Sequence, residues 1–471
     1  MDFPIRLDEQ SGRLALQVTA SLREAIRRQR LAVGALLPST RALAADLGVS
    51  RGVIVEAYEQ LTAEGYLETR RGSGTRVAGR STAGPVPGAR RRTTMPNVGG
   101  GWEPDRAIPF RYDFRFSTPD LSTFPRGRWL WALRHALATV PHADLGYINP
   151  CGVVALREEI TAYLRRVNAA VCDVDEVAVV AGVAQSFVVA LRLLSRRGCK
   201  RLAVEDPSGY RSRGLLENCA YSLLGVPVDE EGIRVDMLER TDADVVLVTP
   251  AHQFPTGVVL SARRRAELVQ WARRRNAFIL EDNYDAEFRY DREPVGCLQG
   301  LAPDRVFLAG SVSKSLAPAL RLGWLVVPKG PYSDECCAER SFLDLGSPVL
   351  DQYALAHLLA TGTYDRHLRA VRRRYRARRD ALVRALQQYL PSWRIHGVAA
   401  GLHLYVELPK DMNPRAIADR AARAGIGIEP IDSMRLAHPS PPALVLGYAR
   451  LSEEELLAAI KSLAHQVVKA K

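Results

Sequence analysis

Residues 37–77 read LPSTRALAADLGVSRGVIVEAYEQLTAEGYLETRRGSGTRV, and this stretch decides the fold of the N-terminal part. A serine N-cap opens a short helix over residues 39–47, and the glycine at position 48 begins a tight turn. A new cap starts a second helix over residues 50–64, which ends at a glycine. Residues 66–77 then predict two strands around a basic turn.

The segment before this stretch adds a third helix. Leu14, Val18, Leu22 and Ile26 recur every four residues and form one apolar stripe. Helix, short helix, turn, helix and basic hairpin is the layout of a winged helix-turn-helix, in which the last helix enters the DNA major groove by its N-terminal residues. A three-helix protein-interaction module is the alternative. The candidate DNA contacts in this layout are Arg41, Ser50, Arg51, Gly52 and Arg71.

Residues 79–109 read GRSTAGPVPGARRRTTMPNVGGGWEPDRAIP and contain almost nothing that could form a core. Such a composition is typical of a flexible tether. We therefore expect three parts: a DNA-binding domain at 1–78, a linker at 79–109 and a large effector domain at 110–471.

Composition bounds the class of protein. The chain has 471 residues and a formal net charge of +13, and 47% of its residues are hydrophobic, which is typical of a globular protein. A basic chain has either a solvated surface or a polyanion partner, and charge alone does not decide between them. No apolar run is long enough for a membrane span, and no secretory leader is visible, so we expect a cytoplasmic protein without a membrane partner. The seven cysteines form no C-x-x-C pair, which predicts reduced thiols and no structural metal.

Beyond residue 150, apolar runs alternate with helical stretches such as Gln185–Leu194 and Ala262–Arg275. This alternation predicts an α/β fold with a mostly parallel sheet, whose ligands bind at the carboxyl ends of the strands. The predicted strands are Val177–Ala181, Arg201–Glu205, Val245–Thr249, Phe278–Glu281, Val306–Leu308 and Gly323–Val327.

Chemistry-bearing residues follow these strands. Lys314 is one of only seven lysines, and burial after a strand would make its amine nucleophilic, able to hold an aldehyde as a Schiff base. Asp282 could pair with a protonated pyridine nitrogen, and Tyr284 could donate to a phenolate oxygen. Hydroxyls, an arginine and the amides at the start of a helix could bind phosphate. Together these groups suit pyridoxal 5′-phosphate (PLP). The phosphate candidates are Ser311, Ser313, Arg321, Val183 and Ala184.

Two resemblances cover nearly the whole chain. PSTRALAADLGVSR, AYEQLTAEGYL and RRGSGTRV resemble the DNA-binding domain of GntR-type regulators. YINPCGVVALREEITAYL, EDPSGY, TPAHQFPTG, EDNYDAEF and SVSKSLAPALRLGW resemble, in order, a fold-type I aminotransferase. The combination is similar to the MocR subfamily of regulators. The resemblance implies that Lys314 forms the Schiff base, Asp282 pairs with the pyridinium, Tyr284 contacts O3′ and Tyr210 stacks on the ring. It also implies the phosphate contacts named above, a homodimer, and DNA contacts at Arg41, Ser50, Arg51, Arg71, Gly72, Ser73 and Gly74.

The sequence departs from the aminotransferase pattern at the substrate end. Phe254 occupies the place of the usual asparagine, and Asn283 that of a second acid. The usual carboxylate-binding arginine is absent before Leu446, which leaves Arg450 and Arg435 as candidates to bind an effector carboxylate. We therefore expect a transcription regulator that binds double-stranded operator DNA and senses PLP or an amine such as GABA or taurine. The alternative is an active aminotransferase with an ancillary DNA-binding module. A regulator could also retain a residual half-reaction of transamination.

Overall fold

The structure is a computed structural model that describes residues 7–8, 12–70, 74–78, 110–116, 118–290 and 296–468, without the side chains of residues 70, 210–212 and 468. The chain divides into two compact units, Met1–Asn97 and Val98–Lys471. No helix among these described residues is both long and apolar enough to cross a bilayer.

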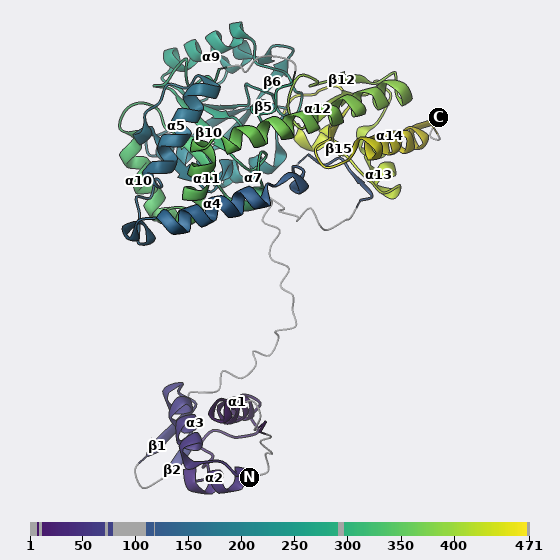
Figure 1. Ribbon diagram of the computed structural model, residues 1–471. Coiled ribbons are helices and arrows are strands. Elements are labelled where there is room, and N and C mark those ends of the chain that lie inside the picture. The colour runs from purple at the N-terminus through teal and green to yellow at the C-terminus, as the bar shows by residue number, and fades with distance from the viewer. Residues whose placement is uncertain are drawn as a thin grey trace. The chain divides into compact units, whose positions relative to one another are not determined.

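The first unit is the predicted winged helix-turn-helix (Figure 1). Its core contains Val18, Leu22 and Ile26 of the predicted stripe on the first helix, whereas Leu14 is only partly buried and lies outside this core; Ile54 is the buried residue near the start of the third helix. The antiparallel wing strands pair Leu67 with Val77. The elements are α1 (Leu14–Arg27), α2 (Thr40–Leu47), α3 (Arg51–Ala63), β1 (Leu67–Arg70) and β2 (Gly74–Val77).

The second unit is built on an eight-stranded sheet of order β4-β11-β10-β9-β8-β5-β6-β7. Five central strands run parallel to their neighbours, from β10 to β6, while β11 and β7 pair antiparallel. All six predicted strands are present, and the mostly parallel α/β fold is confirmed. The strands are β4 (Val177–Val180), β5 (Arg201–Asp206), β6 (Ser222–Asp229), β7 (Gly232–Ile233), β8 (Val245–Val248), β9 (Phe278–Asp282), β10 (Val306–Ser311) and β11 (Gly323–Val326).

Helices cover both faces of this sheet, because both faces are apolar. In β4, Val177 and Val179 join one core cluster, and Ala178 and Val180 join another. Alternate residues of a strand point to opposite faces, so such a strand must be buried on both sides. The covering helices are α4 (Arg126–Thr139), α5 (Val154–Asn168), α6 (Val183–Ser195), α7 (Tyr210–Asn218), α8 (Val235–Leu238), α9 (Ala262–Arg275), α10 (Tyr332–Leu343) and α11 (Val349–Ala360).

A smaller subdomain follows the long helix α12 (Thr363–Tyr389), which runs across the second unit in Figure 1. Its four-stranded sheet has the order β12-β13-β16-β15, and a two-stranded parallel pair joins β14 to β3. The remaining elements are β3 (Tyr112–Asp113), β12 (Arg394–His396), β13 (His403–Glu407), α13 (Pro414–Arg423), β14 (Ile426–Gly427), β15 (Glu429–Pro430), β16 (Ala443–Gly447), α14 (Glu453–Val468) and the 3₁₀ turns Leu121–Thr123, His142–Leu145, Val174–Glu176, Pro318–Leu320 and Ile431–Met434.

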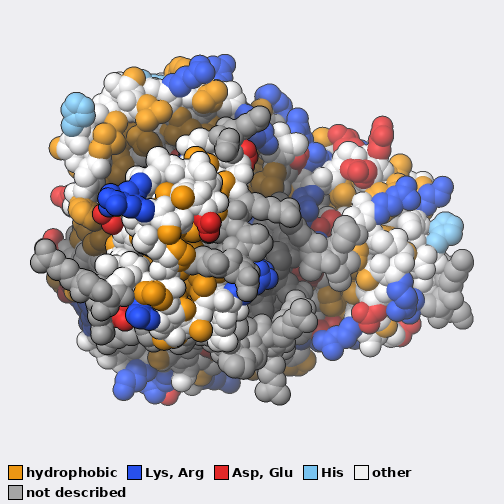
Figure 2. Space-filling model, turned by 90° about the horizontal axis from the view of Figure 1, so that it is seen from below, with side chains coloured by type: hydrophobic (Ala, Val, Ile, Leu, Met, Phe, Trp, Pro, Cys, Tyr) orange, Lys and Arg blue, Asp and Glu red, His pale blue; other side chains and the backbone are white. Residues whose placement is uncertain are grey.

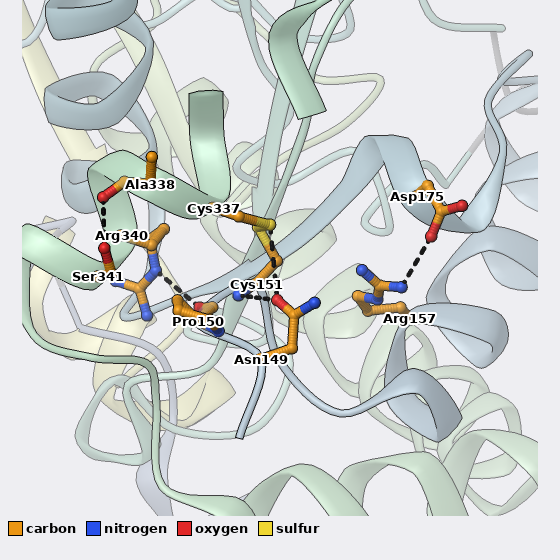
Figure 3. Close-up of a disulfide and its surroundings, with 9 residues drawn as sticks. All are labelled: Asn149, Pro150, Cys151, Arg157, Asp175, Cys337, Ala338, Arg340 and Ser341. Atoms are coloured by element: carbon orange, nitrogen blue, oxygen red, sulfur yellow. Dashed lines mark hydrogen bonds and ion pairs between the residues drawn. A yellow bond between two sulfur atoms is a disulfide. The ribbon is translucent and has the colours of Figure 1, made fainter. Parts of the chain in front are cut away.

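The expectation of seven reduced thiols is wrong for two of them. Cys151 and Cys337 form a disulfide, with a sequence separation of 186 and a Cα–Cα distance of 5.2 Å (Figure 3). The bond joins the segment before α5 to α10, where Arg340 Nε also donates to the carbonyl of Pro150 at 3.4 Å. No C-x-x-C spacing signals this pair, because only the packing of α10 brings the two residues together.

Candidate functional site

The N-terminal ends of α2 and α3 form an exposed polar surface on the first unit. Arg41 is the second residue of α2, and Arg51 and Gly52 open α3; all three are exposed. The N-cap Ser50 makes no side-chain capping bond. A Cβ added to Gly52 would meet only the Ser50 hydroxyl, at 3.8 Å, so packing inside the unit does not require the glycine.

Two contacts fix α3 within the first unit, which we call the winged head. The hydroxyl of Tyr58 donates to the carbonyl of Pro38 at 2.9 Å, and Arg23 on α1 pairs with Glu64 at 2.6 Å. These contacts fix the angle at which α3 meets its neighbours. In the wing, Gly74 opens β2 with φ of +78°, whereas Arg71, Gly72 and Ser73 lie outside the described residues.

In the second unit, a cavity lies at the carboxyl edge of the sheet. Asp282 is the last residue of β9, Tyr284 follows two residues later, and Lys314 comes three residues after β10. The sheet therefore brings the three predicted residues together. The lining is Phe116, Val204, Glu205, Ser208, Gly209, Arg213, Leu216, Leu223, Leu247, Thr249, Phe254, Asp282, Tyr284, Lys314, Leu402 and His403.

Asp282 carries an unused acceptor in this cavity. Its Oδ1 is buried and has no hydrogen-bond partner among the described residues. Burial, together with the nearby Asp285, raises the pKa of Asp282 to about 8, whereas Lys314 opposes the shift. Buried acceptors are normally paired, so this oxygen is placed to receive a donor from a ligand.

Tyr284 is held by a buried histidine–carboxylate pair. His252 Nδ1 lies 2.8 Å from Asp285 Oδ2 and 3.2 Å from the Tyr284 hydroxyl, and the Tyr284 hydroxyl also donates to the His252 carbonyl at 3.2 Å. Burial and the neighbouring Asp285 raise the pKa of Tyr284 well above its usual value, so the phenol stays protonated as a donor. The sequence pattern did not predict the roles of His252 and Asp285.

The small subdomain packs directly against the pair formed by His252 and Asp285. A Cβ on Gly401, which has φ of +84°, would lie 2.1 Å from the His252 ring and 2.8 Å from Asp285. Only glycine therefore allows this approach. Burial lowers the pKa of the adjacent His403 to about 3, with a further contribution from His252, so His403 is a neutral ring in the lining.

The predicted phosphate contacts converge beside the cavity. Gly182 caps the N-terminus of α6, and a Cβ there would lie 3.3 Å from both terminal nitrogens of Arg321. Gly323 lies between two of these segments, because a Cβ on it would meet Gly182 Cα at 2.9 Å and Ser311 Cβ at 3.0 Å. The Ser313 amide points to the Ser311 hydroxyl at 3.4 Å. The amides of Val183 and Ala184 begin α6, so an anion cradle forms at this point.

Phe254 takes the place of a polar group at the cavity wall. Its ring meets that of Tyr284 edge-on, with centroids 6.2 Å apart. Gln253 holds the loop in this shape, since its amide donates to the carbonyl of Pro207 at 3.0 Å and accepts from the Thr256 hydroxyl at 2.6 Å. The wall beside Tyr284 is therefore apolar. The side chain of Tyr210, predicted to stack here, is outside the described residues, although α7 begins at that position.

The two predicted effector arginines do not line the cavity. Arg450 pairs with Asp113 at 2.7 Å, and Arg435 bonds to Asp432 and to Ser440. Arg213 on α7 does line it; its two terminal nitrogens donate to the carbonyls of Arg435 and Met434, each at 3.1 Å, and its buried Nε has no partner in the described part of the chain. The sequence signal for Arg213 is its position three residues after Tyr210, on the same face of a helix.

These groups suit a particular kind of ligand. An amine, a carboxyl group with an unused oxygen, a phenol donor and an anion cradle can together hold an aromatic aldehyde that has a basic ring nitrogen and an anionic substituent. The described residues thus fit PLP, on the evidence of the Asp282 oxygen and the Gly182 cradle.

Comparisons with known proteins match both units. Residues 14–77 match the family described as bacterial regulatory proteins, gntR family, and residues 122–463 match aminotransferase class I and II. The pyridoxine biosynthesis transcriptional regulator PdxR of Corynebacterium glutamicum is 32% identical over 97% of this chain and 96% of its own. The probable rhizopine catabolism regulatory protein MocR of Rhizobium meliloti is 31% identical over 95% and 92%.

A solved structure supports the fold of the second unit. An archaeal alanine:glyoxylate aminotransferase superposes with a TM-score of 0.70 and 24% identity, over 78% of this chain and 92% of that one. This likeness shows the fold alone.

Proposed function

This chain belongs to the MocR subfamily of GntR-type transcription regulators, and from that premise we propose that its large unit senses PLP, or an amino compound that reacts with it, at Lys314. The chain is a DNA-binding regulator with an aminotransferase-like domain. The observation that carries the proposal is the unpaired, buried Oδ1 of Asp282 in the cavity that Lys314 also lines.

The polar residues in and beside the cavity each have a proposed role toward the cofactor. PLP supplies an electron-withdrawing ring and an aldehyde that condenses with amines. Lys314 would supply the amine that holds the aldehyde, Asp282 would balance the charge of the ring nitrogen, and the Tyr284 hydroxyl would donate to the ring oxygen. Ser311, Ser313, Arg321, and the amides of Val183 and Ala184 hold the phosphate. Arg213, whose terminal nitrogens are held by the carbonyls of Arg435 and Met434, would offer its Nε–H to an effector carboxylate.

The names of the relatives support a small-molecule effector. That of the Corynebacterium protein concerns pyridoxine biosynthesis, which favours PLP itself, whereas that of the Rhizobium protein concerns rhizopine catabolism. A ligand regulates only if it binds two arrangements of the protein with different affinity. The cavity lies between the large sheet and the Gly401 loop of the small subdomain, so closure on a ligand is the change we propose.

The experiment that tests this function is a footprint on the DNA upstream of the chain's own gene, with and without PLP, and with PLP plus candidate amines. We expect the affinity or the length of the footprint to change with PLP or with the amine. Identical footprints in all conditions would show that the cavity does not sense these ligands.

We propose a homodimer as the functional assembly. Several large apolar side chains are exposed on contiguous elements: Trp131 (41%) and Leu137 (63%) on α4, Tyr147 (92%), and Phe342 (78%) on α10. The disulfide joins α10 to the segment just after Tyr147. Exposed apolar groups in one region are typical of a surface that another chain covers. A sedimentation measurement should give twice the mass of 52.0 kDa.

Replacing Arg51 with alanine should weaken operator binding more than binding to random DNA. Arg51 opens α3, where a guanidinium can bond to a guanine edge, and loss of one such pair costs about 1–3 kcal/mol. Titration of both duplexes at one salt concentration measures the difference. Arg28→Ala at the end of α1, which removes an exposed arginine paired with Glu24, is the control and should change neither affinity. Equal losses on the two duplexes for Arg51→Ala would refute base reading by this residue.

A further inference from the structure

The long helix α12 carries an unusual charge. It contains nine arginines and only two acidic residues, Asp365 and Asp380. Part of this charge is used inside the fold, since Arg372 donates to the carbonyl of Glu287 and Arg379 donates to the carbonyl of Val398 at 2.6 Å. These inward arginines are explained by the packing of α12 against the rest of the unit.

The outward arginines are not explained in this way. Arg366, Arg369, Arg373 and Arg384 are exposed, and their spacing at 100° per residue places them on one face of the helix, which we call the α12 stripe. Within the described part of the chain, no carboxylate pairs with Arg369, Arg373 or Arg384. The stripe extends about 27 Å along the helix at about 1.5 Å per residue.

The surface between these arginines is open. Small residues, Ala370 and Ala377, lie between the guanidinium groups, and the carboxylate of Asp380 on the same face is held by Arg379 at 2.7 Å. A row of arginines on one face of a helix allows a long anionic partner to contact several of them at once.

Arginine richness of the whole chain does not account for the α12 stripe. Basic side chains occur on several parts of the surface in Figure 2. Helix α9 has six arginines, and each of them has a partner: Arg273 lies 3.8 Å from Asp304, and Arg274 pairs with Glu239. The others bond to carboxylates or carbonyls. The fold thus supplies acceptors for the arginines of α9 and, through the Thr363 hydroxyl, for Arg366, but among the described residues it supplies none for Arg369, Arg373 and Arg384 of the α12 stripe.

We propose that the α12 stripe is a second DNA-contacting surface, which binds phosphates of the same duplex that the winged head recognises. Arginine matches phosphate geometry through two parallel N–H donors. The head and the stripe belong to one chain, so DNA bound by the head meets the stripe at the effective concentration that a covalent tether provides. The proposal rests on DNA binding by the chain and not on the cofactor.

The test measures the salt dependence of DNA binding by the full chain. The variant Arg369→Gln/Arg373→Gln/Arg384→Gln removes three unpaired charges, and Arg273→Gln/Arg274→Gln/Arg275→Gln removes three exposed, partnered charges from α9 as the matched control. Each phosphate contact contributes about 0.9 to the slope of log affinity against log salt. Between 50 and 200 mM salt, wild-type affinity should therefore fall about 40-fold more than that of the stripe variant. The control should keep the wild-type slope.

A second readout separates phosphate contacts from altered base recognition. The stripe variant should lose the same factor on operator and on random duplexes of equal length, and its footprint on the operator should shorten. A wild-type slope and footprint in the stripe variant would overturn the proposal, as would an equal reduction of the slope in the α9 control. Loss of the PLP response alone, with the stripe effect intact, would refute the proposed sensing function and leave this proposal standing.

Discussion

Replacing Lys314 with alanine is expected to abolish covalent retention of PLP. Among the described lysines, Lys314 is the one that lines the cavity of Asp282 and Tyr284. Without its amine no group in that lining can bond to the aldehyde. After treatment with borohydride and denaturation, the wild type should carry the cofactor and the variant should carry none.

The control for this prediction is Lys329→Ala, which removes an exposed lysine after β11. It should trap the cofactor like the wild type. The Lys314 variant should also lose any change in DNA affinity that PLP causes, because PLP is no longer attached covalently in its cavity. A reducible bond that survives in Lys314→Ala would assign the attachment to another lysine.

The sequence predicted most of the large sheet because its strands are continuous apolar runs, buried on both faces. Strand β6 was missed because Gly225 and Pro227 interrupt its pattern. The structure explains Gly225: a Cβ there would lie 2.9 Å from Asp206 Oδ2, whose oxygens accept from the amides of Leu436, Ala437 and His438. These hydrogen bonds join Asp206 to residues about 230 positions later in the chain, so local sequence propensity cannot predict them.

The candidate site was predictable to the extent that its residues directly follow strands. Lys314, Asp282 and Tyr284 follow β10 and β9, and parallel strands bring such positions to one edge. His252 and Arg213 were not predicted, because their roles depend on how a loop and α7 turn toward the cavity. The pairing of Cys151 with Cys337 depends likewise on tertiary packing, and no spacing rule predicts it.

Replacing Asp282 with asparagine should have two opposite effects. It should weaken PLP binding at least about 100-fold, because removing one partner of a buried charge pair costs about 3–5 kcal/mol. Equilibrium dialysis of PLP against the wild type and the variant measures this loss. Asp411→Asn, an exposed acid of the same unit, should change nothing.

The same substitution should stabilise the cofactor-free protein at alkaline pH. Burial raises the pKa of Asp282 to about 8, whereas an unfolded aspartate titrates near about 4. The folded state therefore favours the protonated form, so this carboxyl stabilises it fully below pH about 4, and the stabilisation is lost as pH rises toward 8. Asparagine does not ionise, and the free energy of unfolding of the variant should exceed that of the wild type by on the order of 5 kcal/mol at pH 8, because a shift of about four pKa units is worth about 1.4 kcal/mol for each unit, with little difference at pH 4. Urea unfolding of both proteins at the two pH values checks this. If the difference in unfolding free energy between the two proteins does not change with pH, Asp282 is ionised in the empty cavity. Its oxygen would then already have a counter-charge before PLP binds.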